Sequence, residues 1–282
     1  MALIEFENVS YKMPNEVLAL EKVNLRVDEG ELVAIVGGNG AGKTTLLKHM
    51  NGLLKPVTGT VRVKGKPTTE SSVAELSKQI GLVFQNSDHQ LFSESVKEEV
   101  AFGLRNFGFP PSEVEERVAR ALNAFGLGQM SDRAPLTLSG GEKKRLCIAL
   151  VTAWDPIVLA LDEPTVGQDH LNKVRLLELV RRLIRDKRTV LIVSHDLEFL
   201  WPLQPRTVVM SGGRIVADGP AASIFTNFEL LESSGLRQPQ LARLAVALES
   251  PSPFRDVDEA VAWLREKNGP WSSGSQTAFG KG

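Results

Sequence analysis

Residues 37–44 read Gly-Gly-Asn-Gly-Ala-Gly-Lys-Thr and match the phosphate-binding pattern G-x-x-x-x-G-K-[ST]. The almost wholly apolar run 31–37 is typical of a buried parallel strand, and residues 43–54 have the apolar spacing of a helix. In such a turn, backbone N–H groups surround a phosphate, and the following helix points its positive end at the anion. Lys43 would neutralise the β- and γ-phosphates, and the Thr44 hydroxyl would ligate Mg²⁺. The predicted nucleotide-binding residues are Gly37, Gly38, Asn39, Gly40, Ala41, Gly42, Lys43, Thr44 and Thr45.

The order of strand, turn and helix recurs later in the chain. Residues 157–161 and 189–193 are short apolar runs, each followed by polar residues. Strands that alternate with helices predict an α/β fold with a mostly parallel, doubly wound sheet. Residues 1–30 read as further strands, and 206–210 and 214–218 read as a closing hairpin across Ser211-Gly212-Gly213.

Two carboxylates follow the apolar run 157–161 directly. Ligands of doubly wound sheets bind outside the carboxyl ends of the strands, which is where Asp162 and Glu163 would lie. Adjacent side chains at a strand end can do different work. We expect Asp162 to hold Mg²⁺ and Glu163 to orient and polarise the attacking water.

The pattern changes between about residues 86 and 155, where strand signals disappear. Residues 95–108 and 111–126 carry apolar residues at helical spacing, and the second segment opens with Pro111. This predicts a helical subdomain inserted into an α/β domain of residues 1–222. Residues 223–268 read as a C-terminal helical extension, and the Gly- and Ser-rich stretch 269–282 is expected to be disordered.

Composition excludes some classes of protein. The net charge is −1, so no excess of basic residues favours a nucleic-acid partner. The single cysteine, Cys147, fits a reducing compartment and reads as a small buried hydrophobe on a helix. No run approaches the ~18 apolar residues of a membrane span, and the N-terminus lacks signal-peptide features. We expect a cytosolic protein; if it works at a membrane, another chain would hold it there.

Residues 138–145, LSGGEKKR, resemble the signature motif of ATP-binding cassette (ABC) proteins. Together with 37–44 and 157–164, the resemblance covers residues 1–222 and implies an ABC-type P-loop ATPase. Its signature residues would be Ser139, Gly140, Gly141 and Glu142, where Glu142 replaces the commoner Gln. They start a helix and so offer a second anion site. In the family, two domains pair head to tail, and the signature of one closes on the ATP bound by the other.

The resemblance carries over to single residues. Gln85 resembles the glutamine that touches Mg²⁺ and relays to the membrane partner, Asp169 the aspartate at the dimer interface, and His195 the histidine at the γ-phosphate. The implied catalytic set is Glu163, His195 and Gln85, with Mg²⁺ on Thr44, Gln85 and Asp162. Either Tyr11 or Met13 would pack on adenine.

Residues 85–108, 163–169 and 230–248 are similar to ATPase subunits of energy-coupling factor (ECF) transporters. This similarity implies a second ATPase subunit, identical or related, a membrane-embedded coupling subunit and a small substrate-binding membrane protein. It also implies a place on the cytoplasmic face of the membrane and uptake of a vitamin or a transition-metal ion.

Two questions about surfaces stay open at this level. Leu91 and Phe92 would either meet a membrane partner or lie in the core. The face made by residues 241, 244, 245 and 248 would either pair two ATPases or pack within its own chain.

Two other functions compete with transport. A soluble ABC ATPase acting on ribosomes or nucleic acid is the alternative, although such proteins usually carry two cassettes or long coiled coils. A non-hydrolysing regulator would be expected to lack at least one residue of the set Lys43, Gln85, Asp162, Glu163 and His195.

Overall fold

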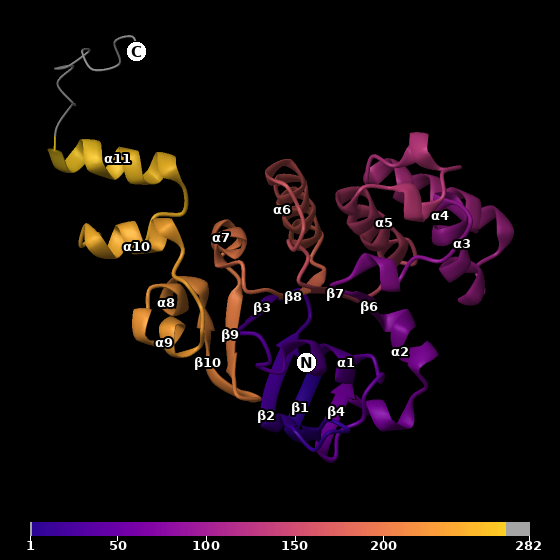
Figure 1. Cartoon of the computed structure of the whole chain (residues 1–282), viewed down its shortest axis with the longest axis horizontal. Coiled ribbons are helices and arrows are strands. Elements are labelled where there is room, and N and C mark those ends of the chain that lie inside the picture. The colour runs from indigo at the N-terminus through magenta and orange to yellow at the C-terminus, as the bar shows by residue number, and fades with distance from the viewer. Residues whose placement is uncertain (1, 269–282) are drawn as a thin grey trace, which may run out of the picture.

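The computed structural model describes residues 2–268, which form two sheets with helices around them (Figure 1). A six-stranded sheet has the order β10-β9-β3-β8-β7-β6, and all its neighbours are parallel except the β9–β10 hairpin. Its strands are β3 (Leu32–Val36), β6 (Ile80–Val83), β7 (Val158–Asp162), β8 (Thr189–Val193), β9 (Arg206–Ser211) and β10 (Arg214–Pro220). The predicted parallel sheet and closing hairpin are therefore confirmed.

A second sheet is antiparallel and has the order β2-β1-β4-β5. Its strands are β1 (Ala2–Lys12), β2 (Leu18–Asp28), β4 (Thr58–Val63) and β5 (Lys66–Pro67). The last two were not predicted. β4 is short and contains Gly59 at φ +82°, and it exists because β1 supplies its hydrogen-bond partners.

The apolar runs of the central sheet are buried on both faces. In β3, Val33 and Ile35 face the core shared with the antiparallel sheet, whereas Ala34 and Val36 face the core under the helices. Because side chains alternate along a strand, a run with two buried faces must be apolar throughout. This explains the pattern seen in residues 31–37.

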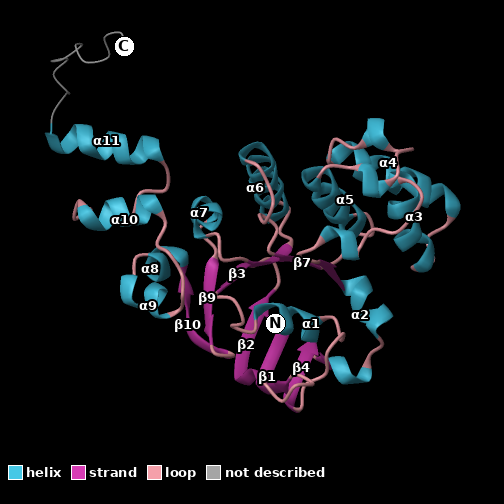
Figure 2. Cartoon of the chain, in the orientation of Figure 1, coloured by secondary structure: helices cyan, strands magenta, loops and turns pink. Residues whose placement is uncertain are grey.

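Helices fill the segment between β6 and β7, and the part of the structure from residue 84 to 157 contains no strand. They are α3 (Val96–Asn106), α4 (Pro111–Ala124) and α5 (Gly140–Thr152), gathered at one end of the molecule (Figure 2). Ser95 caps α3 by accepting the N–H of Glu98, and Pro111 stands at the first position of α4. The predicted helical subdomain is confirmed.

The other helices are α1 (Lys43–Met50), α2 (Val73–Gln79), α6 (His170–Arg185) and α7 (Leu197–Leu200). Short 3₁₀ turns occupy Thr68–Glu70, Ser87–His89, Gly128–Met130, Pro135–Thr137 and Trp201–Leu203. None of the helices between residues 2 and 268 has both the length and the apolar character needed to cross a membrane.

The C-terminal extension contains α8 (Ala221–Phe225), α9 (Phe228–Ser233), α10 (Gln240–Ala247) and α11 (Val257–Asn268). The predicted boundary between residues 222 and 223 falls within α8 and stays a prediction, and the stretch 269–282 lies outside the described residues. Leu241, Ala245 and Leu248 pack with Phe254 and Trp263 inside the extension, whereas Leu244 is 38% exposed. Most of that helix face is thus buried within its own chain.

Candidate functional site

The phosphate-binding loop joins β3 to α1, and its glycines are required by their surroundings. Gly37 has φ +154°, and a Cβ there would lie 2.2 Å from the carbonyl oxygen of Met210. Gly42 has φ +100°, and a Cβ there would lie 2.5 Å from the carbonyl oxygen of Ala19. A side chain at either position would therefore displace a neighbouring backbone segment. The predicted residues 37–45 all lie in this loop and in the first turn of α1.

Lys43 lies buried at the centre of this loop. Its Nζ donates to the carbonyl oxygens of Gly37 at 2.8 Å and of Gly38 at 2.9 Å. Burial lowers the pKa of the Lys43 ammonium, and the charges of Glu163 and Asp162 partly oppose that shift. The loop therefore brings one buried cation to the two carboxylates that follow β7.

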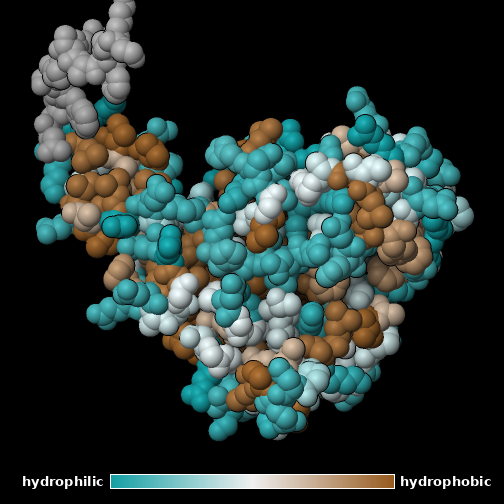
Figure 3. Space-filling model, viewed as in Figure 1, coloured by the Kyte–Doolittle hydropathy of each residue, from teal (hydrophilic) through white to brown (hydrophobic). Residues whose placement is uncertain are grey.

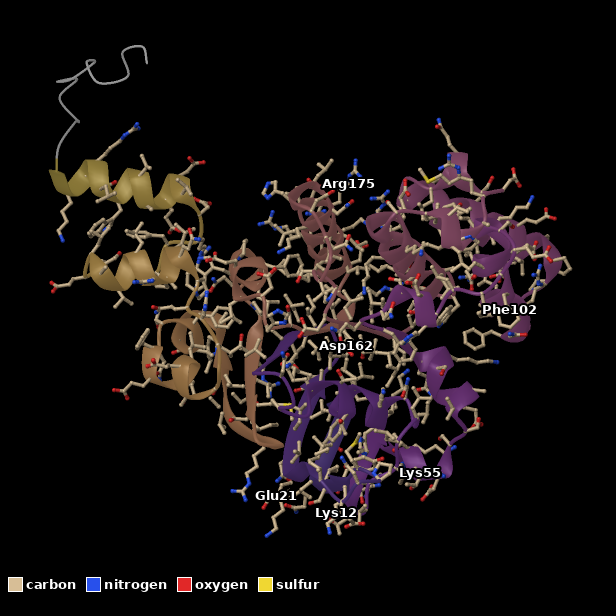
Figure 4. The ribbon with its side chains drawn as sticks, in the orientation of Figure 1. Lys12, Glu21, Lys55, Phe102, Asp162 and Arg175 are labelled. Atoms are coloured by element: carbon tan, nitrogen blue, oxygen red, sulfur yellow. The ribbon has the colours of Figure 1, made fainter. Side chains whose placement is uncertain are left out.

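Asp162 ends β7 beside the first turn of α1 (Figure 4). The Thr44 hydroxyl donates to Asp162 Oδ2 at 2.8 Å, and Asp162 Oδ1 is buried without a hydrogen-bond partner. Burial raises the pKa of the Asp162 carboxyl. A carboxylate oxygen with a free lone pair next to a hydroxyl is the oxygen-only donor set that Mg²⁺ prefers. These two residues fit the predicted Mg²⁺ site.

Glu163 and His195 meet at the ends of the neighbouring strands β7 and β8. His195 Nδ1 lies 2.9 Å from Glu163 Oε2, and the Glu163 side chain is 8% exposed against 54% for His195. Glu163 has φ +45°, and its backbone N–H donates to the Val193 carbonyl at 2.8 Å. The left-handed backbone directs a largely buried carboxylate to the mouth of the phosphate loop, where the imidazole limits its movement.

The signature segment begins α5. Ser139 and Glu142 form a capping box, in which Glu142 Oε2 accepts the Ser139 N–H at 2.8 Å and Ser139 Oγ accepts the Glu142 N–H at 3.4 Å. The Ser139 N–H also lowers the pKa of the Glu142 carboxyl. Glutamate and glutamine serve equally in this box. Glutamate at position 142, in place of the commoner glutamine, therefore leaves the start of α5 intact.

The surroundings of Gly140 and Gly141 differ. A Cβ at Gly141 would lie 2.3 Å from Asn172 Nδ2, whereas a Cβ at Gly140 would meet nothing within 4 Å. In residues 2–268 no hydrogen bond joins the signature segment to the phosphate loop. Within one chain, the two helix starts predicted to bind anions are thus not joined by hydrogen bonds.

The other predicted residues lie as follows. The Gln85 side chain is exposed after β6, and Asp169 caps α6 by accepting the Asn172 N–H at 2.8 Å. The Tyr11 ring packs edge-on against His49 at 4.9 Å, whereas Met13 is 40% exposed. Met13 is thus the more exposed of the two residues, since Tyr11 is half-buried.

Two contacts with the predicted site were missed in the sequence. Lys144, 4% exposed on α5, donates to the carbonyl oxygens of Phe84 at 2.9 Å and Gln85 at 2.8 Å. The Gly38 N–H donates to the carbonyl of Ser234, just after α9, at 3.0 Å. Lys144 stands in the charged run Glu142–Arg145, so nothing in the sequence singles it out, and the second contact involves only backbone atoms and has no sequence signal.

Comparisons with known proteins agree with this geometry. Residues 20–166 match the sequence profile of the ABC transporter family. The chain is 42% identical over 244 residues to the energy-coupling factor transporter ATP-binding protein EcfA of Methanothermobacter thermautotrophicus, covering 86% of this chain and 78% of that protein. It is 41% identical over 242 residues to EcfA2 of Acetivibrio thermocellus, covering 85% and 86%.

Solved structures show the same fold. CbiO1 of Clostridium perfringens, described as part of the ABC transporter complex CbiONQ, superposes with a TM-score of 0.73 at 35% identity, covering 87% of this chain and 99% of CbiO1. The ATP-binding cassette MJ0796, a dimer in a post-hydrolysis state with ADP and phosphate, superposes with a TM-score of 0.70 at 29% identity, covering 77% and 98%.

Proposed function

Because the chain belongs to the ABC transporter family and is one of its ATPases, we propose that it is the ATP-hydrolysing subunit of an ECF-type importer. The observation that carries the proposal is the meeting of Lys43, Asp162, Glu163 and His195 at one edge of the central sheet. The similarity to EcfA proteins and to CbiO1 supports the ECF branch.

The chain's own groups divide the work of phosphoryl transfer. Lys43 and the N–H groups of residues 38–45 bind and neutralise the phosphates, which is mainly positioning and electrostatics. Glu163 accepts a hydrogen bond from the attacking water and polarises it toward the γ-phosphate. His195 fixes the Glu163 carboxylate through its Nδ1 and keeps Nε2 free for a phosphate oxygen.

Mg²⁺ would be held by Thr44 and Asp162, whose Oδ1 is free to ligate, with Gln85 as a further oxygen donor. The ion would supply charge neutralisation of the β- and γ-phosphates. Met13 would pack against the adenine, since its side chain is 40% exposed.

We propose that two ATPase subunits pair head to tail, so that Ser139 to Glu142 of one chain reach the γ-phosphate bound by the other. Two observations support this arrangement. Ser139 and Gly140 are exposed, and the open space around Gly140 leaves room for a phosphate. Asp169 would lie at the same interface. The exposed apolar residues Leu244, Val246, Val257 and Val261 of the extension, a region rich in apolar side chains in Figure 3, would add to it.

The membrane-embedded partner would dock on the helical subdomain. Leu91 is 4% exposed and belongs to the core, but Phe92 is 66% exposed and packs edge-on against Phe102, itself 43% exposed, at 4.9 Å (Figure 4). Paired exposed aromatic rings are typical of protein interfaces. The buried Glu99 accepts the N–H groups of Phe92 and Ser93 at 2.8 and 2.7 Å, so this surface is firmly connected to α3.

The proposal is tested by pull-down of the tagged protein from native membranes solubilised in mild detergent, followed by mass spectrometry. We expect a polytopic coupling subunit and a small substrate-binding membrane protein, whose identity would reveal whether the cargo is a vitamin or a transition-metal ion. The F92S/F102S variant is expected to lose both partners while keeping its basal ATP hydrolysis. Phe228→Ser, which changes a 59% exposed ring on α9, is the control and is expected to keep them.

The same experiment separates the transporter from the alternative function. Recovery with ribosomal or nucleoid proteins, and with no membrane protein, would leave the ATPase intact but rule out the importer.

A further inference from the structure

A cavity of about 580 Å³ lies between α5, α6 and the C-terminal end of α4, away from the phosphate loop. Its volume is within the range of small-molecule sites, ~300–1,000 Å³. Lys144 and Pro164 form its inner end, next to the catalytic segment, and Arg182 and Arg185 form its outer end.

Positive charge dominates the walls of this cavity. Lys144, Arg145, Arg175, Arg182 and Arg185 line it, and Glu178 is the one acidic side chain among its described lining residues. Within residues 2–268, none of the four arginines takes part in an ion pair. By contrast, Arg188, just beyond α6, pairs with Asp155. Arg175, Arg182 and Arg185 are exposed to solvent, and the charges of Glu142 and Asp169 act on Arg145, so the cavity gathers arginines that no ion pair among the described residues holds.

Arg145 is the least exposed of the four arginines. Its Nη1 donates to Asn172 Oδ1 at 2.6 Å, but its Nε is buried without a partner. Burial lowers the pKa of the Arg145 guanidinium, and the nearby charge of Arg175 lowers it further. This N–H is closed off from the cavity, so Arg145 is held in the cavity wall through its Nη1 contact with Asn172.

Much of the remaining wall is apolar, beside Gln168 and Asn172. Phe125 and Ile148 line one side, and Leu176 and Leu179 line the other. Arginine forks match carboxylate, sulfonate and phosphate oxygens, and the apolar wall suits a hydrocarbon or aromatic body. The cavity thus has the two-part chemistry of a site for an amphipathic anion.

The outer end of the cavity is remote from the proposed dimer interface. Helices α5 and α6 both start at segments assigned to that interface, Ser139 and Asp169, and run away from it. At ~1.5 Å per residue, Arg182 lies ~20 Å along α6 from Asp169. Figure 4 shows Arg175 well separated from Asp162. The outer end of the cavity is therefore separate from the nucleotide site, whereas its inner end adjoins that site through Lys144 and Pro164.

We propose that this cavity binds a small organic anion, with its charged group on Arg182 and Arg185 and its apolar body on Phe125 and Leu179.

The test uses 1-anilinonaphthalene-8-sulfonate, a fluorescent sulfonate with an aromatic body, on the full-length protein. Excess MgADP keeps the probe out of the nucleotide site. We expect saturable binding of one probe per chain, and a dissociation constant about tenfold higher in R182S/R185S because two charged contacts are lost. Arg175→Ser is expected to weaken binding less. Arg181→Ser, an exposed arginine of α6 outside the cavity, is the matched control and is expected to bind normally.

Thermal melting and ATP hydrolysis check that each variant is folded. Equal binding by the wild type and R182S/R185S, or binding that does not saturate, would overturn the proposal. Competition then identifies the charged group: displacement by phenyl phosphate assigns a phosphate, and displacement by benzoate a carboxylate. Displacement by neither compound counts against the site.

Discussion

His195 Nδ1 lies 2.9 Å from Glu163 Oε2, although the two residues are 32 positions apart in the chain. They meet because β7 and β8 are parallel neighbours, and Glu163 and His195 each follow the carboxyl end of one of these strands. The imidazole therefore holds in place the carboxylate that we assign to polarise water.

Replacing Glu163 by Gln is expected to abolish hydrolysis while keeping ATP bound. The amide keeps the shape of the side chain but is too weak a base to polarise water, so phosphate release is expected to fall at least ~100-fold. The measurement is single-turnover phosphate release together with nucleotide retention on a filter. Glu115→Gln, at an exposed site of α4, is the control. Near-normal turnover in Glu163→Gln would show that another group is the base.

Replacing Lys144 by Met is expected to uncouple the signature helix from the segment around Gln85. The change leaves the Phe84 and Gln85 carbonyls without the donor that the buried Lys144 supplies, which destabilises the protein by about 1–3 kcal/mol. It also removes a positive charge that acts on Asp162 and Glu163. Urea unfolding measures the loss of stability, and ATP titrations separate the effects on kcat and KM.

The neighbouring residue provides the control for that experiment. Lys143 pairs with Asp88 at 2.8 Å, and Asp88 is 57% exposed. A surface pair of this kind contributes at most about 1 kcal/mol. Lys143→Met is therefore expected to retain near-normal stability and turnover. Equal losses in both variants would contradict a special role for Lys144.

Replacing Gly235 by Ala is expected to weaken ATP binding from outside the loop. Gly235 has φ +70° and follows Ser234, whose carbonyl accepts the Gly38 N–H at 3.0 Å. An alanine in this conformation costs about 1 kcal/mol, and relief of the strain would move Ser234 away from Gly38. We expect the dissociation constant for ATP to rise by up to about fivefold, measured by calorimetry.

Gly108→Ala introduces the same backbone strain at a distant site. Gly108 has φ +85°, and a Cβ there would meet nothing within 4 Å. This variant is expected to lose similar stability but to bind ATP normally. If both variants lost ATP affinity equally, the Gly38–Ser234 contact would have no particular role.

Stability is expected to fall above pH 9 because of Cys147. Burial raises the pKa of its thiol to about 11 from an ordinary value of 9.0. Between these values the unfolded thiol loses its proton whereas the folded one keeps it. The native state then binds more protons, so the free energy of unfolding falls by at most about 1.4 kcal/mol per pH unit.

Urea unfolding at several pH values measures this slope. Cys147→Ala is expected to flatten it, because the alanine variant lacks the titrating group. An unchanged slope would assign the alkaline instability to other residues. The burial of Cys147 itself, expected from the sequence, is confirmed.

Much of the fold could be predicted because its signals are local. Each of these signals lies within one continuous segment of the sequence. This holds for the phosphate loop, for the apolar runs of β3, β7 and β8, and for the helical spacing of α3 to α5. Strands β4 and β5 and helices α2, α8 and α9 were missed, because these short elements have weak periodicity of their own and are stabilised by their neighbours.

The sequence by itself determined which chemical groups the site contains, since strand ends and glycine turns are local features. Tertiary structure decided which of them meet: the pairs Thr44–Asp162 and Glu163–His195, the ammonium of Lys144 on Gln85, and the Gly38–Ser234 contact. It also buried Leu91 while leaving Phe92 exposed, and it placed the arginines of α5 and α6 around one cavity. Burial and pairing depend on the relative positions of distant segments. These positions result from packing of the whole chain, which no short stretch of sequence specifies.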